Sequence, residues 1–209
     1  MSKETRRIIF YIDGFNFYFG LRANNWQAYY WLDYPKLAKN LSRKLENSEV
    51  VKTKYFTSRI TSPGDKRIRQ NNYLEVLEMR GDIDIYYGNY KENKYECTGC
   101  HRPNYIHNEK QTDVNIAVQM LIDAFQDNFD VAVLLSGDSD LVPPIRAVKS
   151  LFPDKQVIAC FPPNRSSKEI RAICNGQLHI HEPDLKNSQL PDQVIRGDGF
   201  VYKRPTKWK

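Results

Sequence analysis

Long apolar runs are absent from this 209-residue sequence, and cysteine is scarce, with four residues. No run approaches the ~20 residues that a membrane-spanning helix needs. The charged start, MSKETRRIIFYIDG, holds no apolar stretch of the length found in secretory signals. We therefore expect a soluble cytoplasmic protein with no membrane partner, whose cysteines are reduced thiols or metal ligands rather than disulfides.

Basic residues outnumber acidic ones, 31 Lys and Arg against 25 Asp and Glu, for a net charge of +6. They gather at residues 66–69 and 203–209. This excess suits a polyanionic partner, although many proteins of similar charge never contact nucleic acid. The aspartates that follow the predicted strands are acidic positions in a basic chain. Nucleases commonly show that contrast, with basic groups holding phosphates and carboxylates holding a metal.

Short apolar runs alternate with helical patterns, which predicts an α/β domain with a mainly parallel sheet flanked by helices. The predicted strands are residues 8–12, 51–57, 83–87, 131–135 and 157–161, with a short strand at 178–180. The predicted helices are residues 34–45, 66–80, 113–127, 141–151 and 167–174. We expect one domain, residues 1–182, with a polar, aromatic insertion at 91–109 and an extended C-terminal tail, 183–209, packed on it.

Four aspartates lie where this fold would bring them together. Asp13 follows the first strand, Asp138 and Asp140 follow the strand 131–135, and Asp113 opens a helix. Ligands of open α/β sheets bind beyond the carboxyl ends of the strands. Each aspartate has an ordinary alternative as a turn or helix-capping residue. Together they would repel one another unless a cation lay between them, and oxygen ligands suit Mg²⁺ or Mn²⁺.

Five segments carry a family resemblance that covers nearly the whole chain. They are YIDGFNFYFGL at 11–21, KYFTSRI at 54–60, EKQTDVNIAVQMLIDAF at 109–125, DVAVLLSGDSDLVPPIRAVK at 130–149 and LPDQVIRGDGFVYKRPTKW at 190–208. In this order they resemble the NYN domain family of PIN-like ribonucleases, in its LabA-like bacterial branch. The resemblance implies a PIN-like three-layer fold, an acidic Mg²⁺ or Mn²⁺ site, and hydrolysis of RNA to 5′-phosphate products.

The resemblance also implies roles for individual residues. The metal ligands and catalytic acids that it carries over are four aspartates: Asp13, Asp113, Asp138 and Asp140. Asn16 of DGFN and Ser136 of SGDSD become contacts to metal or phosphate. Many family members have a further acid in the helix after the central aspartate. Here Asp123 comes ten residues after Asp113, about 15 Å along a helix, and we do not count it as a ligand.

Further residues are candidates for binding RNA. Arg59 and Arg67 follow the second strand and would lie near the same rim, although this stretch could instead be a solvated helix start. Lys110, just before the central aspartate, is a candidate phosphate ligand. Phe15 and Phe17 could stack on bases, as in single-strand binders, but we expect them to pack in the core.

The insertion contains a second candidate metal site, made of cysteine and histidine: Cys97, Cys100, His101 and His107. A C-x₂-C pair is a competent half-site for structural Zn²⁺. Reduced thiols in an exposed loop, or a redox pair, fit the same residues. The remaining cysteines, Cys160 and Cys174, sit in apolar sequence and are expected in the core.

The sequence favours a metal-dependent ribonuclease acting on RNA, most simply on single strands. The alternative is a catalytically inactive RNA-binding or regulatory module of the same fold. A third reading is a phosphatase or nucleotide hydrolase; DGFN lacks the second aspartate that a haloacid dehalogenase type phosphatase has two residues after the first. The oligomeric state is open, and a homodimer is among the arrangements that the sequence allows.

Overall fold

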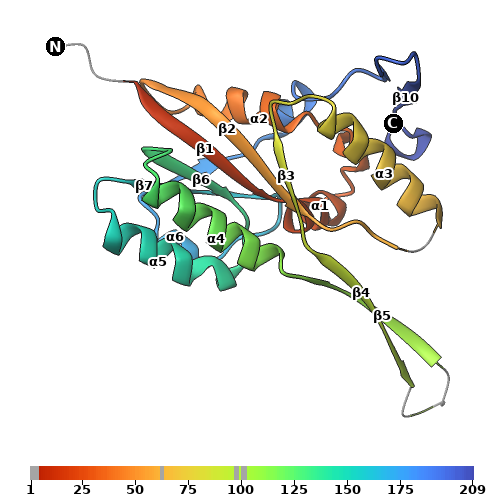
Figure 1. Cartoon of the computed structure of the whole chain (residues 1–209), viewed down its shortest axis with the longest axis horizontal. Helices are drawn as coiled ribbons and strands as arrows, with labels where there is room; N and C mark the ends of the chain where they lie inside the picture. The colour runs from red at the N-terminus through yellow and green to blue at the C-terminus, as the bar shows by residue number, and fades with distance from the viewer. Residues whose placement is uncertain (1–4, 62–63, 97–98, 100–102) are drawn as a thin grey trace.

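A six-stranded parallel sheet lies at the centre of the molecule (Figure 1). The computed structural model describes residues 5–61, 64–96, 99 and 103–209, with the backbone alone along 91–96 and 103–108. The strands stand in the order β3-β2-β1-β6-β7-β8. Their bounds are β1 Arg6–Asp13, β2 Ser48–Thr57, β3 Asp84–Tyr87, β6 Val131–Leu135, β7 Gln156–Phe161 and β8 Gly176–His179. The predicted α/β fold is confirmed.

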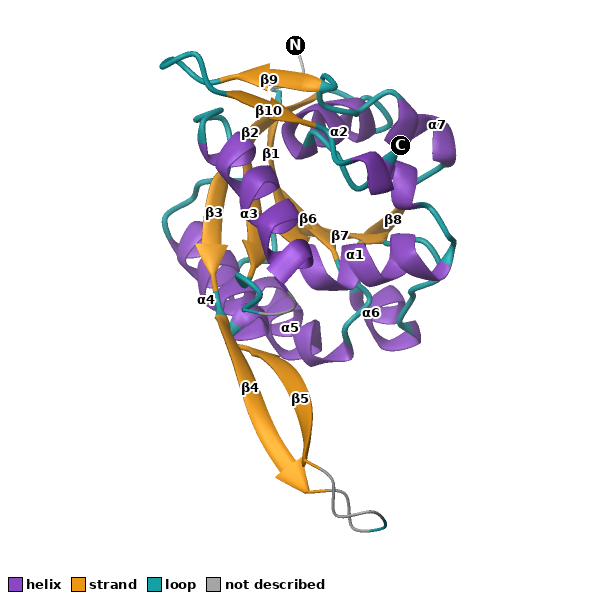
Figure 2. Ribbon diagram, turned by 90° about the vertical axis from the view of Figure 1, so that its right-hand side faces the viewer, coloured by secondary structure: helices purple, strands orange, loops and turns teal. Residues whose placement is uncertain are grey.

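Helices cover both faces of the sheet and make three layers (Figures 1 and 2). One face packs against α1 Gly14–Ala23, α2 Tyr34–Ser42 and α3 Gly64–Glu78, and the other against α4 Thr112–Phe125, α5 Val142–Leu151 and α6 Lys168–Ile173. Successive side chains of β1 point to opposite faces of the sheet and enter both hydrophobic cores. Phe10 and Ile12 lie in the core under α1, α2 and α3, and Ile9 and Tyr11 lie in the core under α4, α5 and α6. Among the described helices, none has the length and apolarity to cross a membrane.

Helix α1, which directly follows β1, was not among the predicted helices. Asp13 caps it, accepting a hydrogen bond from the Asn16 backbone N–H at 2.9 Å. Phe17 and Leu21 lie four residues apart and are buried on one helical face. The expected core packing of Phe17 is thus confirmed, whereas Phe15 is only half-buried.

The insertion forms an antiparallel hairpin, β4 Asn89–Glu96 with β5 Pro103–Lys110, which projects from the body of the domain (Figure 2). It leaves the carboxyl end of edge strand β3 and returns directly into α4. A Cβ on Gly88 would lie 2.6 Å from the Lys110 carbonyl oxygen. The base of the hairpin is therefore closed tightly at the edge of the sheet.

The C-terminal tail is packed, but it is not extended as expected. It contains α7 Glu182–Lys186, the hairpin of β9 Gln193–Ile195 and β10 Val201–Lys203, and a 3₁₀ turn, η3 Thr206–Trp208. The Tyr202 hydroxyl donates to Glu75 of α3 at 2.6 Å. Trp208 contacts Trp31 with 6.2 Å between ring centroids, beside the short turn η1 Gln27–Tyr29. These contacts bury aromatic surface that the tail would otherwise expose.

A buried ion pair joins β2 to α4 beneath the sheet. Lys54 Nζ lies 2.7 Å from Asp123 Oδ2, and both side chains are buried. The Tyr11 hydroxyl donates to the same carboxylate oxygen at 2.7 Å. Asp123 is thus occupied by structural partners, in agreement with its exclusion from the ligands.

Replacing Asp123 with alanine should lower the free energy of unfolding by about 3 to 5 kcal/mol, because it leaves the Lys54 ammonium buried without a counter-charge. Urea unfolding followed by circular dichroism measures this loss. The double variant Lys54→Met, Asp123→Leu removes both charges and should recover part of it. A single variant within about 1 kcal/mol of wild type would show that the pair contributes little.

Candidate active site

The pairing of β1 with β6 brings two predicted site residues into contact. Ile12 stands opposite Leu135 in the parallel register, so Asp13 and Ser136 both emerge at the carboxyl ends of their strands. Ser136 Oγ donates to Asp13 Oδ2 at 2.8 Å. Asp13 is 4% exposed and Ser136 is fully buried. The hydroxyl therefore orients the carboxylate rather than lying open to substrate.

The SGDSD turn is held against α1 by Asn16. Its Oδ1 atom accepts a hydrogen bond from the Gly137 backbone N–H at 3.1 Å. Asp138 donates its backbone N–H to Ser136 Oγ at 3.1 Å and caps a 3₁₀ turn, η2 Ser139–Leu141, by accepting from the Asp140 N–H at 3.1 Å. The capping alternative for Asp138 is thus confirmed, and it uses one of the two carboxylate oxygens, Oδ1.

Gly14 allows the chain to turn sharply from β1 into α1 beside the site. A Cβ at this position would lie 2.6 Å from the Tyr55 hydroxyl and 2.8 Å from the Phe56 carbonyl oxygen. Both distances are shorter than real Cβ contacts. The close approach of α1 to the end of β2 therefore needs glycine here.

Asp113 completes the group of aspartates from the opposite helical layer. It lies in the first turn of α4, and the residue that precedes the helix, Gln111, adopts a left-handed conformation with φ of 75°. Burial, followed by the charges of Asp138 and Asp140, raises the pKa of Asp113. The charges of Asp138 and Asp140 thus act on Asp113, and a shared cation at these three carboxylates stays a prediction.

Glu109 is a fifth acid that the sequence did not reveal. It ends the hairpin, and its Oε1 atom accepts from Ser58 Oγ at 3.2 Å and from Thr112 Oγ1 at 2.5 Å. Burial, aided by the charges of Asp13 and Asp113, raises its pKa to about 7. The signal available in the sequence was its place four residues before the central aspartate. It was missed because the return of the hairpin to the rim is a feature of the fold.

The acidic rim, defined here as Asp13, Glu109, Asp113, Asp138 and Asp140, concentrates negative charge in a partly desolvated place. Burial is the largest cause that raises the pKa of Asp13 to about 6, and the charges of Asp113 and Asp138 act in the same direction. Hydrogen bonds from Asn16 and Ser136 oppose the rise. The rim therefore favours binding of protons or of a cation.

The chemistry of the rim fits a hard divalent cation, since every candidate donor is a carboxylate oxygen. Within the part of the chain that the structure describes, however, no three His, Cys, Asp or Glu side chains form a ready-made metal cage. The cysteine and histidine site of the hairpin falls outside the described residues: Cys97, Cys100, His101 and the side chain of His107. Cys160 and Cys174 are free thiols, buried and half-buried respectively.

The basic residues expected to hold substrate occupy different surroundings. Lys110 is exposed beside the rim, and Arg67 is exposed in the first turns of α3. Arg59 is engaged within the protein, because its guanidinium lies 2.7 Å from Glu78 and 4.8 Å from the centre of the Tyr87 ring. Contacts of all three with substrate remain predictions.

Comparisons with known proteins agree with this architecture. A family model described as the NYN domain matches residues 7–182. The chain is 28% identical over 248 aligned residues to 6-hydroxy-3-succinoylpyridine 3-monooxygenase HspA of Pseudomonas putida (strain DSM 28022 / S16), covering 100% of this chain and 77% of that protein. The structure of this chain is similar to that of VPA0982 of Vibrio parahaemolyticus RIMD 2210633, a protein of unknown function. The TM-score is 0.58 and the identity is 18%, and the match covers 91% of this chain and 99% of that chain. That identity shows the fold alone.

The metal-free protein should become more stable as the pH falls from about 7.5 to about 5. The pKa of Asp13 is about 6 in the folded chain, where burial raises it above its ordinary value of 3.8. The folded state therefore binds a proton that the unfolded chain releases, so stability rises as the pH falls through about 6. Glu109, with a raised pKa of about 7, acts in the same direction.

The expected gain is about 1 to 3 kcal/mol, since one pKa unit corresponds to ~1.4 kcal/mol. Urea unfolding in EDTA at several pH values measures it. Asp13→Asn should be more stable than wild type near pH 7.5 and should show a smaller gain. If the wild type instead loses stability as the pH falls, to the same extent as Asp13→Asn, the prediction of a raised pKa for Asp13 is wrong.

Proposed function

Because the chain belongs to the NYN domain family of PIN-like ribonucleases, we propose that it is a metal-dependent ribonuclease that hydrolyses phosphodiester bonds in RNA at the acidic rim. The observation that carries the proposal is the buried carboxylate of Asp13, whose pKa is raised by burial and, to a smaller extent, by the charges of Asp113 and Asp138. A desolvated carboxylate of this kind is costly for folding. Its placement is understandable if a cation compensates it during function.

The residues of the rim would divide the work between metal binding and proton transfer. Asp13, Asp113, Asp138 and Asp140 would hold Mg²⁺ or Mn²⁺. When bound, such an ion lowers the pKa of a coordinated water and stabilises charge on the phosphate. Glu109, whose pKa is raised to about 7 by burial, is suited to take a proton onto its Oε atoms from an attacking water near neutral pH. Ser136 and Asn16 keep the Asp13 carboxylate and the SGDSD turn in position.

The surroundings of the rim support a nucleic acid as substrate. The chain carries a net charge of +6, and exposed Lys110 lies next to the acids. Basic groups around a carboxylate site would hold phosphates while the acids hold the cation. We expect the polymer to be RNA because of the family resemblance. Single strands as its form and a cytoplasmic location are expectations from the sequence. A homodimer remains among the arrangements to be measured.

Three other functions remain to be separated from this one. An inactive RNA-binding module would keep the fold without the chemistry. A phosphatase or nucleotide hydrolase would use the same acids on phosphate monoesters. The Pseudomonas relative is named as a monooxygenase of a substituted pyridine, and at 28% identity its substrate does not transfer to this chain.

The purified protein should cleave end-labelled single-stranded RNA in Mn²⁺ or Mg²⁺ and should not cleave it in EDTA. The double variant Asp13→Asn, Asp138→Asn should cleave at least about 100-fold more slowly, because metal ligation supplies several kcal/mol of transition-state stabilisation. Asp154→Asn, an exposed aspartate before β7, is the matched control and should cleave normally.

RNA binding without cleavage by any variant would favour the inactive module. Rapid hydrolysis of phosphate monoesters, with intact RNA, would favour the phosphatase. Equal cleavage by the wild type and the double variant would exclude the rim as the catalytic site and would indicate a contaminating nuclease.

Glu109→Gln should lower kcat by roughly 100-fold, the scale of general base catalysis, while leaving metal binding largely intact. The glutamine keeps an oxygen that can accept from Ser58 and Thr112 but cannot take up a proton. Single-turnover cleavage across pH 5.5 to pH 8.5, beside the stability of each variant, tests this. An unchanged rate and pH profile would show that Glu109 is not the general base and has only a structural role.

A further inference from the structure

The loop that follows β7, residues 162–166, lies directly against the turn that carries Asp138. A Cβ on Gly137 would lie 3.2 Å from the Arg165 backbone carbon and 3.2 Å from the Ser166 nitrogen. Gly137 immediately precedes Asp138 in the acidic rim. The backbone of Arg165 therefore borders the site, although it is 25 residues further along the chain than Asp140.

This loop is also fixed to α1. A Cβ on Gly20 would lie 2.7 Å from the Pro163 carbonyl oxygen. The Asn164 side-chain amide donates to Asn24 Oδ1 at 2.6 Å, and Asn164 adopts a φ of 55°. Contacts on both sides thus hold the loop between α1 and the SGDSD turn. Arg165 is presented from a defined backbone position, which lowers the entropy cost of binding.

The side chain of Arg165 stands over an exposed aromatic ring. Its guanidinium carbon is 5.7 Å from the centre of the Phe19 ring, and Phe19 is 37% exposed on α1. Arg165 is exposed, and among the described residues no carboxylate lies within salt-bridge distance of it. The guanidinium is therefore available to an anion while it stays over the Phe19 ring.

Phe19 continues into a row of aromatic rings that leads to the hairpin. Its ring centroid is 6.1 Å from that of Phe15, and Phe15 lies 6.1 Å from Tyr90 with 25° between the ring planes. Phe15 follows Asp13 by two residues, and Tyr90 lies at the base of β4. The row thus borders the acidic rim from the loop 162–166 to the hairpin.

We propose that Arg165 and Phe19 form a nucleotide-binding subsite for single-stranded RNA beside the acidic rim. The guanidinium pairs with a phosphate that neighbours the scissile one, since its planar fork matches phosphate oxygens. The exposed face of Phe19 stacks on the base of that nucleotide. Stacking needs an unpaired base whose face is free, which selects single strands over duplexes. This subsite rests on the proposed function, because it places RNA across the rim.

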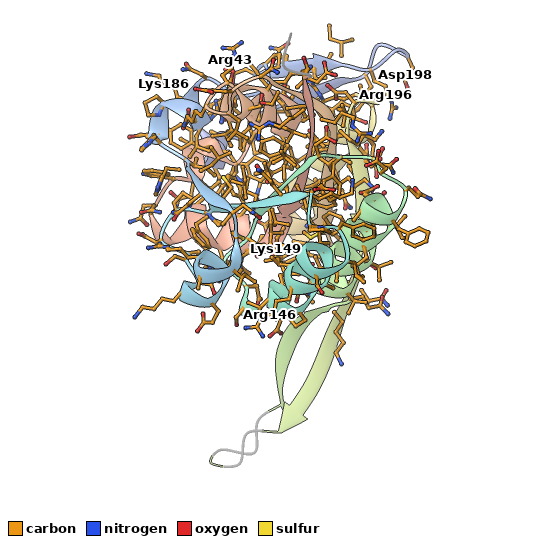
Figure 3. The ribbon with its side chains drawn as sticks, turned by 90° about the vertical axis from the view of Figure 1, so that its left-hand side faces the viewer. Arg43, Arg146, Lys149, Lys186, Arg196 and Asp198 are labelled. Atoms are coloured by element: carbon orange, nitrogen blue, oxygen red, sulfur yellow. The ribbon has the colours of Figure 1, made fainter. Side chains whose placement is uncertain are left out.

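Binding in EDTA separates the subsite from the chemistry. The probe is a 12-nucleotide single-stranded RNA with one 2-aminopurine base, whose fluorescence falls when the base stacks. The variants are Arg165→Gln, which removes the charge, and Phe19→Leu, which keeps an apolar side chain without an aromatic face. Arg43→Gln is the control, because Arg43 is an exposed arginine at the end of the molecule remote from the hairpin (Figure 3).

Each variant should have its own signature. Arg165→Gln should weaken binding at least about five-fold and reduce the slope of log K against log salt by roughly 0.7, the loss of one phosphate contact on a single strand. Phe19→Leu should weaken binding by a similar factor and remove the 2-aminopurine quenching, with the salt slope unchanged. Arg43→Gln should match the wild type in slope and quenching.

The outcomes distinguish this proposal from the proposed function. Binding that depends on Arg165 and Phe19, in a protein that never cleaves RNA, keeps the subsite and overturns the hydrolysis. Metal-dependent cleavage, with both variants binding like Arg43→Gln, keeps the hydrolysis and overturns the subsite. Absence of RNA binding by folded wild type, or equal losses on duplex RNA, overturns the subsite too. Thermal unfolding of each variant establishes that it is folded; Phe19 and Arg165 are surface positions.

Discussion

The hydrogen bond from Ser136 to Asp13 is the contact on which the candidate site depends. It joins the ends of two adjacent parallel strands, and it requires the register that sets Ile12 opposite Leu135. A shift of one residue would turn these side chains to the other face of the sheet and separate the acids. Alternate side chains of β1 pack into the two apolar cores, and this packing fixes the register. Packing far from the rim thereby determines which carboxylates meet at it.

The acidic rim lowers the stability of the folded chain, because its desolvated carboxylates favour binding of a proton or a cation. Asp13 is buried, and its neighbours share its charge, so its pKa is raised to about 6. Among the residues whose side chains the structure describes, the other buried acids have direct partners: Asp123 has Lys54 and Tyr11, and Asp33 has Arg80. This difference separates a structural carboxylate from a functional candidate. Both kinds are buried, but Asp13 has like charges around it and hydroxyl or amide donors in place of a cation.

Much of the fold was readable from the sequence, because buried parallel strands are short apolar runs and Asp13 and Asp138 directly follow two of them. Helix α1 was missed since GFNFYFGLRA mixes glycine with aromatic residues, which are weak helix formers. The polar hairpin has no apolar alternation to reveal its strands. Glu109 and Arg165 could not be placed, because each reaches the rim through loop geometry that links distant parts of the chain.

The hairpin is fastened at its base, next to the acidic rim. Gly88 lies against Lys110, and the Asn89 side chain donates to Gln111 at 2.8 Å, so the two strands are fastened where they join the domain. Glu109 stands opposite Tyr90, one position further out than Lys110, so this acid of the rim belongs to the hairpin and lies next to the fastened base. The length and sequence of the outer strands can therefore vary while the contacts at the base, with those of Glu109 to Ser58 and Thr112, keep this acid beside the rim.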